Sequence, residues 1–200
     1  MSNTWFIADT HFGHKNILDF EDRPFDSIEE MEEKMVGAWN NVVQNKDLVY
    51  LLGDFCFSSN KEWNRILSRL KGRIILVKGN HDSLKTIRRV FKEGHIDGYH
   101  EVGAIINHNN LVFHLTHYPL ELGDRPNSFN ISGHIHSSLN GQACQINVGV
   151  DSEFMREYYK RETDSNGLPL SFGSPVPIEY IFKYAQDVNE LLKKQYVRGK

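Results

Sequence analysis

The sequence predicts an α/β fold in which a mixed sheet system has its helices outside. Strand-like and helical patterns alternate in the first half of the chain, whereas strand-like runs dominate in the later part. In addition, 200 residues, of which 40% are hydrophobic, are enough to bury one substantial core. We therefore expect a single domain over residues 1–200.

The first half contains three short apolar runs, at residues 4–8, 48–52 and 74–78, and each stops at Asp or Gly. Such runs are typical of buried strands. Between them, apolar residues recur every three or four positions from Ser27, and Ser27 with Glu30 forms a capping box. Two more helices are predicted, one from Asn60 to a stop at Gly72 and one over residues 83–92.

A β-hairpin opens the second half, because apolar residues 102–106 and 111–115 flank the polar turn His108-Asn109-Asn110. Shorter strand-like segments follow at residues 129–131 and 145–150. Residues 155–173 show no clear period and contain Asn166-Gly167, so we expect an irregular, exposed insertion there. An amphipathic helix near residues 178–195 closes the chain.

The composition limits the partners and the setting. A net charge of -3, from 23 basic and 26 acidic residues mixed along the chain, gives no long-range attraction to polyanions, so nucleic acid is not supported as a partner. Cys56 and Cys144 are too few for a disulfide framework and form no CxxC pair, which favours buried thiols in a cytoplasmic protein. The N-terminus lacks the features of a secretory signal, and no stretch is long enough to span a bilayer.

Five polar clusters each follow a predicted strand. They are Asp9-Thr10-His11, Gly53-Asp54, Gly79-Asn80-His81-Asp82, Thr116-His117 and Gly133-His134-Ile135-His136. Ligands bind outside the carboxyl ends of strands in open α/β sheets, so we expect these clusters to converge. Asp and His two positions apart in an extended segment point the same way, so Asp9 with His11, and His134 with His136, can face one cavity.

The residue types in these clusters indicate metal ions. Carboxylate, amide and imidazole ligands suit first-row divalent metals, and the candidate positions are more than one ion needs. Two divalent ions held by Asp9 and Asp54 as the only carboxylates would keep a residual positive charge. Such a centre favours an anionic substrate, and a phosphate ester is the best match.

Taken in order, the series D-x-H, G-D, G-N-H-D, H and G-H-x-H resembles that of the metallophosphoesterase, or calcineurin-like phosphoesterase, family over residues 9–136. The resemblance implies two facing mixed β-sheets flanked by helices, in a four-layer sandwich with the metals at one end. It also implies the ligands: Asp9, His11 and His136 for the first metal, Asn80, His117 and His134 for the second, and Asp54 as the bridge.

The resemblance further implies that a metal-bridging hydroxide attacks phosphorus. His81 would lie outside the coordination shell and stabilise the transition state or donate a proton to the departing oxygen. Asp82 is expected to orient His81 and to border the substrate. Arg23 is expected to contact the substrate too, because a guanidinium can grip phosphate with two hydrogen bonds. Manganese is the favoured metal, with iron, zinc, nickel or magnesium as alternatives.

One departure from the family narrows the activity. Asp54 is followed by Phe55-Cys56-Phe57-Ser58 and not by the further Asp and Arg of the phosphoprotein phosphatase branch, and the chain lacks the accessory length of the DNA-repair nucleases. We therefore expect a phosphodiesterase of small or nucleotide-like substrates. The alternatives are a phosphomonoesterase, an enzyme acting on RNA or single-stranded DNA, and a non-catalytic protein-binding scaffold. Competent residues at every ligand position favour an enzyme over a scaffold. The sequence leaves the oligomeric state open.

Overall fold

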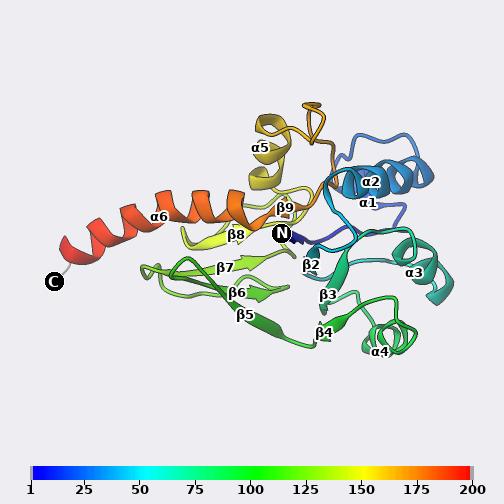
Figure 1. The fold of residues 1–200 in the computed structure, drawn as a ribbon, viewed down its shortest axis with the longest axis horizontal. Helices are drawn as coiled ribbons and strands as arrows, with labels where there is room; N and C mark the ends of the chain where they lie inside the picture. Colours follow the sequence, from blue (N-terminus) through cyan, green and yellow to red (C-terminus); the bar gives the residue numbers. More distant parts are fainter. Residues whose placement is uncertain (1, 199–200) are drawn as a thin grey trace.

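The computed structural model describes residues 2–198 and contains two mixed β-sheets with flanking helices (Figure 1). The first sheet has the order β4-β3-β2-β1-β9. Its strands are β1 (Thr4–Ile7), β2 (Leu48–Leu51), β3 (Arg73–Val77), β4 (Gly98–His100) and β9 (Val176–Pro177). The first four are parallel, and β9 runs antiparallel to β1. The three strands predicted in the first half are all confirmed.

The second sheet has the order β5-β6-β7-β8. Its strands are β5 (Gly103–His108), β6 (Leu111–Thr116), β7 (Ser128–Ser132) and β8 (Gln145–Asn147). The predicted hairpin is the antiparallel pair β5–β6, whereas β6, β7 and β8 are parallel to one another. The two sheets are connected where Ala8, just after β1, exchanges backbone hydrogen bonds with Val148 and Val150, just after β8.

Two apolar cores hold these layers together, and β1 contributes to both. Trp5 and Ile7 pack in a core with helices α2 (Ile28–Val42), α3 (Asn60–Leu67) and α4 (Leu84–Lys92). Phe6, between them, points to the opposite face and packs with Phe113 and Phe129 of the second sheet. This alternation is the two-residue period of a strand that is buried on both faces. The two sheets therefore face each other across the second core.

The predicted helices of the first half are all present, together with the short α1 (Ile17–Phe20). The capping box of α2 is formed in part: the Glu30 amide donates to the Ser27 hydroxyl, and the Glu30 carboxylate accepts from the amide of Asp26. Strand β4 was not predicted, because three half-buried residues are too few to show an alternating pattern.

The expected irregular insertion at residues 155–173 is wrong in its first part, where α5 (Glu153–Arg161) forms. Ser152 caps this helix by accepting from the Met155 amide, and Met155, Tyr158 and Tyr159 form a buried face with helical spacing. Two large aromatic residues at adjacent positions hid that period in the sequence. Residues 162–173 are turns joined by one isolated bridge, as expected.

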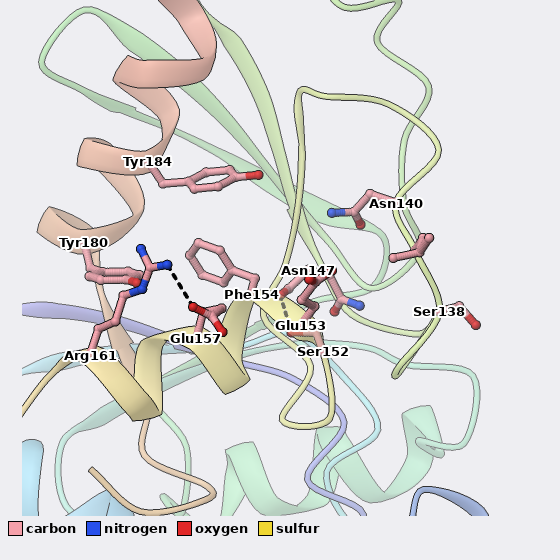
Figure 2. Close-up of a pocket in the computed structure, with 11 residues that line it drawn as sticks. Ser138, Asn140, Asn147, Ser152, Glu153, Phe154, Glu157, Arg161, Tyr180 and Tyr184 are labelled. Atoms are coloured by element: carbon pink, nitrogen blue, oxygen red, sulfur yellow. Dashed lines mark hydrogen bonds and ion pairs between the residues drawn. The ribbon is translucent and has the colours of Figure 1, made fainter. Parts of the chain in front are cut away.

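Helix α6 (Ile178–Arg198) confirms the predicted closing helix and runs past the second sheet toward the C-terminus (Figure 1). Phe154 of α5 packs edge-on against Tyr180 and Tyr184 of α6, beside a pocket of about 350 Å³ (Figure 2). Within residues 2–198, none of the helices combines the length and the apolar character that crossing a membrane requires.

Candidate metal centre

The strand ends bring the polar clusters to one edge of the molecule. Strands β1, β2 and β3 pair in parallel with Ile7 opposite Leu51 and Leu51 opposite Leu76, so they end almost level. Asp9, Asp54 and Asn80 follow these strands by two or three residues. His117 follows β6, and His134 and His136 follow β7 in the facing sheet.

The backbone turns sharply at most of these positions. Five of the seven predicted ligands have a left-handed φ, namely Asp9 (55°), His11 (51°), Asp54 (52°), His134 (71°) and His136 (47°). This conformation is unfavourable for residues with a Cβ and persists only where the surroundings enforce it. It turns consecutive side chains away from the direction of the strand and into a common space.

The first predicted ligand set comes together in the fold. Asp9, His11 and His136 offer ligand atoms that all lie within 4.8 Å of one another. The Asp9 carboxylate is fully buried and accepts from the His134 amide at 2.9 Å. His11 Nε2 is buried and has no hydrogen-bond partner among the described residues. An imidazole nitrogen without a partner is costly in a protein interior, and a metal ion would satisfy it.

The second predicted set is also assembled. Asn80 Oδ1 lies 2.8 Å from His117 Nε2 and 2.9 Å from His134 Nδ1. His117 Nδ1 faces the Leu52 carbonyl at 2.9 Å, and a carbonyl only accepts, so this nitrogen carries the proton in the neutral ring. The lone pair of His117 Nε2 then points at oxygen atoms of Asn80 and Asp54. Converging lone pairs of this kind fit a cation between them.

Asp54 lies between the two sets. Its Oδ2 is 3.7 Å from His11 Nε2 on one side and 3.4 Å from His117 Nε2 on the other. Its Oδ1 accepts from the His81 amide at 2.9 Å. A side chain on Gly79 would collide with this carboxylate, and one on Gly133 would collide with that of Asp9. The two glycines leave the space that the carboxylates occupy.

The electrostatics of the centre also fit cations. Burial raises the pKa of Asp9 to about 7, against the charges of His136 and His117. Burial opposes ionisation of Asp54 as well, but the adjacent ring of His117 and the backbone amide of His81 lower its pKa to about 2. Burial lowers the pKa of His11 to about 3, which leaves its ring neutral and able to ligate. A divalent cation would stabilise both carboxylates in their ionised form.

Arg23 does not face the centre, contrary to expectation. Its side chain is fully buried and donates to both oxygens of Asp151, at 3.0 and 2.8 Å, and to the carbonyls of Asp9 and Thr10. Asp151 Oδ2 in turn lies 3.2 Å from His136 Nδ1. The guanidinium therefore has no free donor for phosphate and instead supports the carboxylate behind His136.

Asp82 is also placed differently from the prediction. It is buried, and its carboxylate accepts from the backbone amides of Asp54, Gly79 and Phe55 at 2.8 to 3.1 Å. These bonds fix the loops after β2 and β3 to each other. Asp82 therefore holds the backbone of Asp54 in place and has no hydrogen bond to His81 among the described residues.

His81 borders open space beside the centre, and its ring lies 5.6 Å from that of His11 between centroids. Its ring is 43% exposed, and its Nε2 lies 4.0 Å from Asp54 Oδ2. The ring stands edge-on to Phe57, with centroids 5.1 Å apart. His81 therefore reaches the centre without being part of either ligand set.

Three further residues, His14, Phe57 and Tyr118, lie at the rim of the centre. His14 Nδ1 lies 3.3 Å from His11 Nδ1, and its ring stacks on that of Phe57 with centroids 4.4 Å apart. On the opposite side, Tyr118 contacts the ring of His134 at 4.4 Å between centroids and is half-exposed. Tyr118 directly follows His117, and Phe57 lies three positions after Asp54; this closeness to motif positions was their only signal in the sequence.

Comparison with known proteins assigns the family. A family model for calcineurin-like phosphoesterases matches residues 2–164. The chain belongs to the calcineurin-like phosphoesterase family. The resemblance carried by the five motifs is thereby confirmed, and so is the expected architecture of two mixed sheets with flanking helices. The family is one of metal-dependent phosphoester hydrolases, and this phosphoesterase has the ligand clusters to match.

This phosphoesterase has similar relatives with little functional description. It is 34% identical over 165 residues to the uncharacterized protein MJ1445 of Methanocaldococcus jannaschii, covering 76% of this chain and 83% of the relative. It is 37% identical over 92 residues to the gene 66 protein of Mycobacterium phage L5, covering 44% of each chain. The crystal structure of AQ665, a protein of unknown function from Aquifex aeolicus, superimposes with a TM-score of 0.67 at 28% identity, covering 92% of this chain and 99% of the other.

Proposed function

We propose that this phosphoesterase is a dinuclear metal-dependent phosphodiesterase acting on a small or nucleotide-like substrate. The position of Asp54 carries the proposal, because one buried carboxylate faces His11 of the first ligand set and His117 of the second. A bridging carboxylate is what two closely spaced cations require. The mixed nitrogen and oxygen donors suit manganese, which we favour, as well as iron, zinc, nickel or magnesium.

In this proposal Asp9, His11 and His136 hold one ion, and Asn80, His117 and His134 hold the other. The bound ions would supply Lewis acidity that acidifies a water molecule and neutralises charge on the phosphate. The chain contributes the alignment: the Leu52 carbonyl sets the tautomer of His117, and Asp151 sets the orientation of His136.

His81 is the proposed proton donor to the departing oxygen or stabiliser of the transition state. The exposure of its ring and its closeness to Asp54 support this role. Replacing His81 with Asn should lower kcat by about 10²- to 10⁴-fold, as for loss of a general acid, and leave two metals bound per chain. Steady-state kinetics with metal analysis checks this. A variant with unchanged kcat would remove His81 from the mechanism.

A diester is favoured over a monoester by the placement of Arg23. A phosphomonoester carries a second negative charge, and the arginine expected to meet phosphate donates instead to Asp151 and two carbonyls. A diester carries one negative charge and therefore needs fewer cationic groups to neutralise it. The free, buried Cys56 and Cys144 are in keeping with the proposed cytoplasmic setting.

The deciding experiment offers bis-p-nitrophenyl phosphate and p-nitrophenyl phosphate to the protein loaded with manganese, nickel, zinc or magnesium. We expect faster turnover of the diester with at least one metal. Faster turnover of the monoester would replace the diesterase with a phosphatase. No turnover of either compound with any metal would contradict the proposed enzyme and favour a binding scaffold.

A further inference from the structure

A small cavity adjoins the centre on the side of His81. It has a volume of about 330 Å³ and is lined by Cys56, Phe57, Ser58, Trp63, His81, Ser83 and Thr86. This volume falls at the lower end of the range of about 300 to 1,000 Å³ that is usual for small-molecule sites. The pocket between α5 and α6 in Figure 2 is of similar size, but none of the predicted metal ligands, nor His81, lines it.

Phe57 lines this cavity with a partly exposed aromatic ring. Phe57 is 46% exposed although two other rings contact it. His14 stacks on Phe57 but does not line the cavity, so the cavity meets the ring from another side. His81 fixes one ring edge at 5.1 Å between centroids. His14 and His81 therefore hold the Phe57 ring in place, and the ring remains exposed where it lines the cavity.

Three other residues that line the cavity carry neutral hydroxyl groups. Ser58, Ser83 and Thr86 contribute three hydroxyl groups, each able to donate and to accept. The Thr86 hydroxyl donates to the Asn60 side chain at 2.9 Å, which leaves its lone pairs available. Among the described residues, the ring of His81 and the thiol of Cys56 are the only titratable groups that line the cavity. One planar apolar face with several neutral hydroxyls matches a ligand that combines a planar ring with hydroxyl groups.

We propose that this cavity is the subsite for the departing alcohol and that the alcohol is a nucleoside, with its base stacked on Phe57 and its sugar among the three hydroxyls. The inference rests on the proposed function, since a donor to the departing oxygen must lie on the side of the leaving group. His81 both lines this cavity and approaches Asp54. Every base has a flat face, so stacking on one aromatic ring accepts nucleosides of any base.

Binding tests the subsite without turnover. Adenosine should bind the wild-type protein in isothermal titration calorimetry, whereas 1-O-methylriboside, which has the sugar without the base, should bind at least about tenfold more weakly. Phe57→Leu should weaken adenosine binding about tenfold or more, and Phe57→Trp should restore it. Phe91→Leu, the matched control at an exposed phenylalanine that does not line the cavity, should bind adenosine as the wild type does. Wild-type protein that binds adenosine and the riboside equally, or not at all, would overturn the inference, and so would equal losses in Phe57→Leu and Phe91→Leu.

Turnover of cyclic phosphates provides a second, independent test of the subsite. Adenosine 2′,3′-cyclic phosphate and the cyclic phosphate of 1-O-methylriboside have the same reacting diester and differ only in the base. The ratio of their kcat/KM values should favour the adenosine compound about tenfold in the wild type and fall toward one in Phe57→Leu. A competition experiment with a short oligoadenylate and adenosine 5′-monophosphate distinguishes two sources of the nucleoside. Stronger inhibition by the oligoadenylate would indicate the end of a nucleic acid, and stronger inhibition by the monophosphate would indicate a free nucleotide. Turnover of bis-p-nitrophenyl phosphate tests the proposed function separately. Adenosine binding without any hydrolysis would therefore contradict the proposed function but not the subsite.

Discussion

The two ligand sets of the centre differ in what lies behind them. Behind His136 stands a buried ion pair, in which Arg23 holds Asp151 with two hydrogen bonds and Asp151 faces the imidazole at 3.2 Å. His117 Nδ1 instead hydrogen-bonds to the neutral carbonyl of Leu52, and the Asp9 carboxylate lies 4.0 Å from it. His136 is therefore supported by a hydrogen-bonded carboxylate, and His117 by a backbone carbonyl.

The two sets also differ in exposure. In the first set Asp9 and His11 are buried and His136 is half-buried, whereas in the second set His117 is buried, His134 is half-buried and Asn80 is exposed. A cation held by buried, charge-supported ligands exchanges with solvent more slowly than one held at the surface. Under the proposed function, we therefore expect the first set to hold its ion more tightly than the second.

The largest effect is expected at the residue that the two sets share. Asp54→Asn should lose both metal ions and reduce hydrolysis to background, because the charge that faces His11 and His117 is removed. Metal analysis by mass spectrometry and assay of the same sample check this. If the variant keeps two ions and its activity, Asp54 does not bridge the sets.

Removing a ligand from one set alone should separate the two sites. Asn80→Ala should lower the metal content from two ions to one per chain, since the exposed second set loses its amide oxygen while the first set is untouched. Titration of metal-free protein would then show one binding step in place of two. Asn166→Ala, in an exposed turn, is the control and should keep both steps. Loss of both ions from Asn80→Ala would mean that the sites do not act separately.

A smaller effect is expected behind the first set. Arg23→Met leaves the buried Asp151 with His136 as its remaining charged neighbour at hydrogen-bond distance, so we expect a loss of about 3 to 5 kcal/mol in the free energy of unfolding. Affinity for the first ion should fall about 10- to 100-fold. Urea unfolding and metal titration measure the two effects. Arg88→Met breaks an exposed pair with Glu101 and should cost about 1 kcal/mol or less. Equal effects of the two substitutions would show that Arg23 has no special role.

The sequence by itself determined the strands of the first half and the positions of the candidate ligands. Residues 4–8, 48–52 and 74–78 are apolar runs that stop at Asp or Gly, and that pattern is local, so it can be identified without knowing the fold. The convergence of Asp9, Asp54 and Asn80 follows from the same pattern, because parallel strands that end level bring their next residues to one edge. The family resemblance added the division into two ligand sets.

Tertiary structure decided what each of the remaining polar residues does. Arg23 looked free to meet phosphate, yet its partner Asp151 lies 128 positions away, and no local pattern connects them. Asp82 was likewise predicted to orient His81, whereas in the structure it accepts hydrogen bonds from three backbone amides of two loops. Helix α5 and the partly exposed ring of Phe57 also depend on packing between distant segments. Contacts of this kind arise from the shape of the assembled core, and the spacing of neighbouring residues does not encode them.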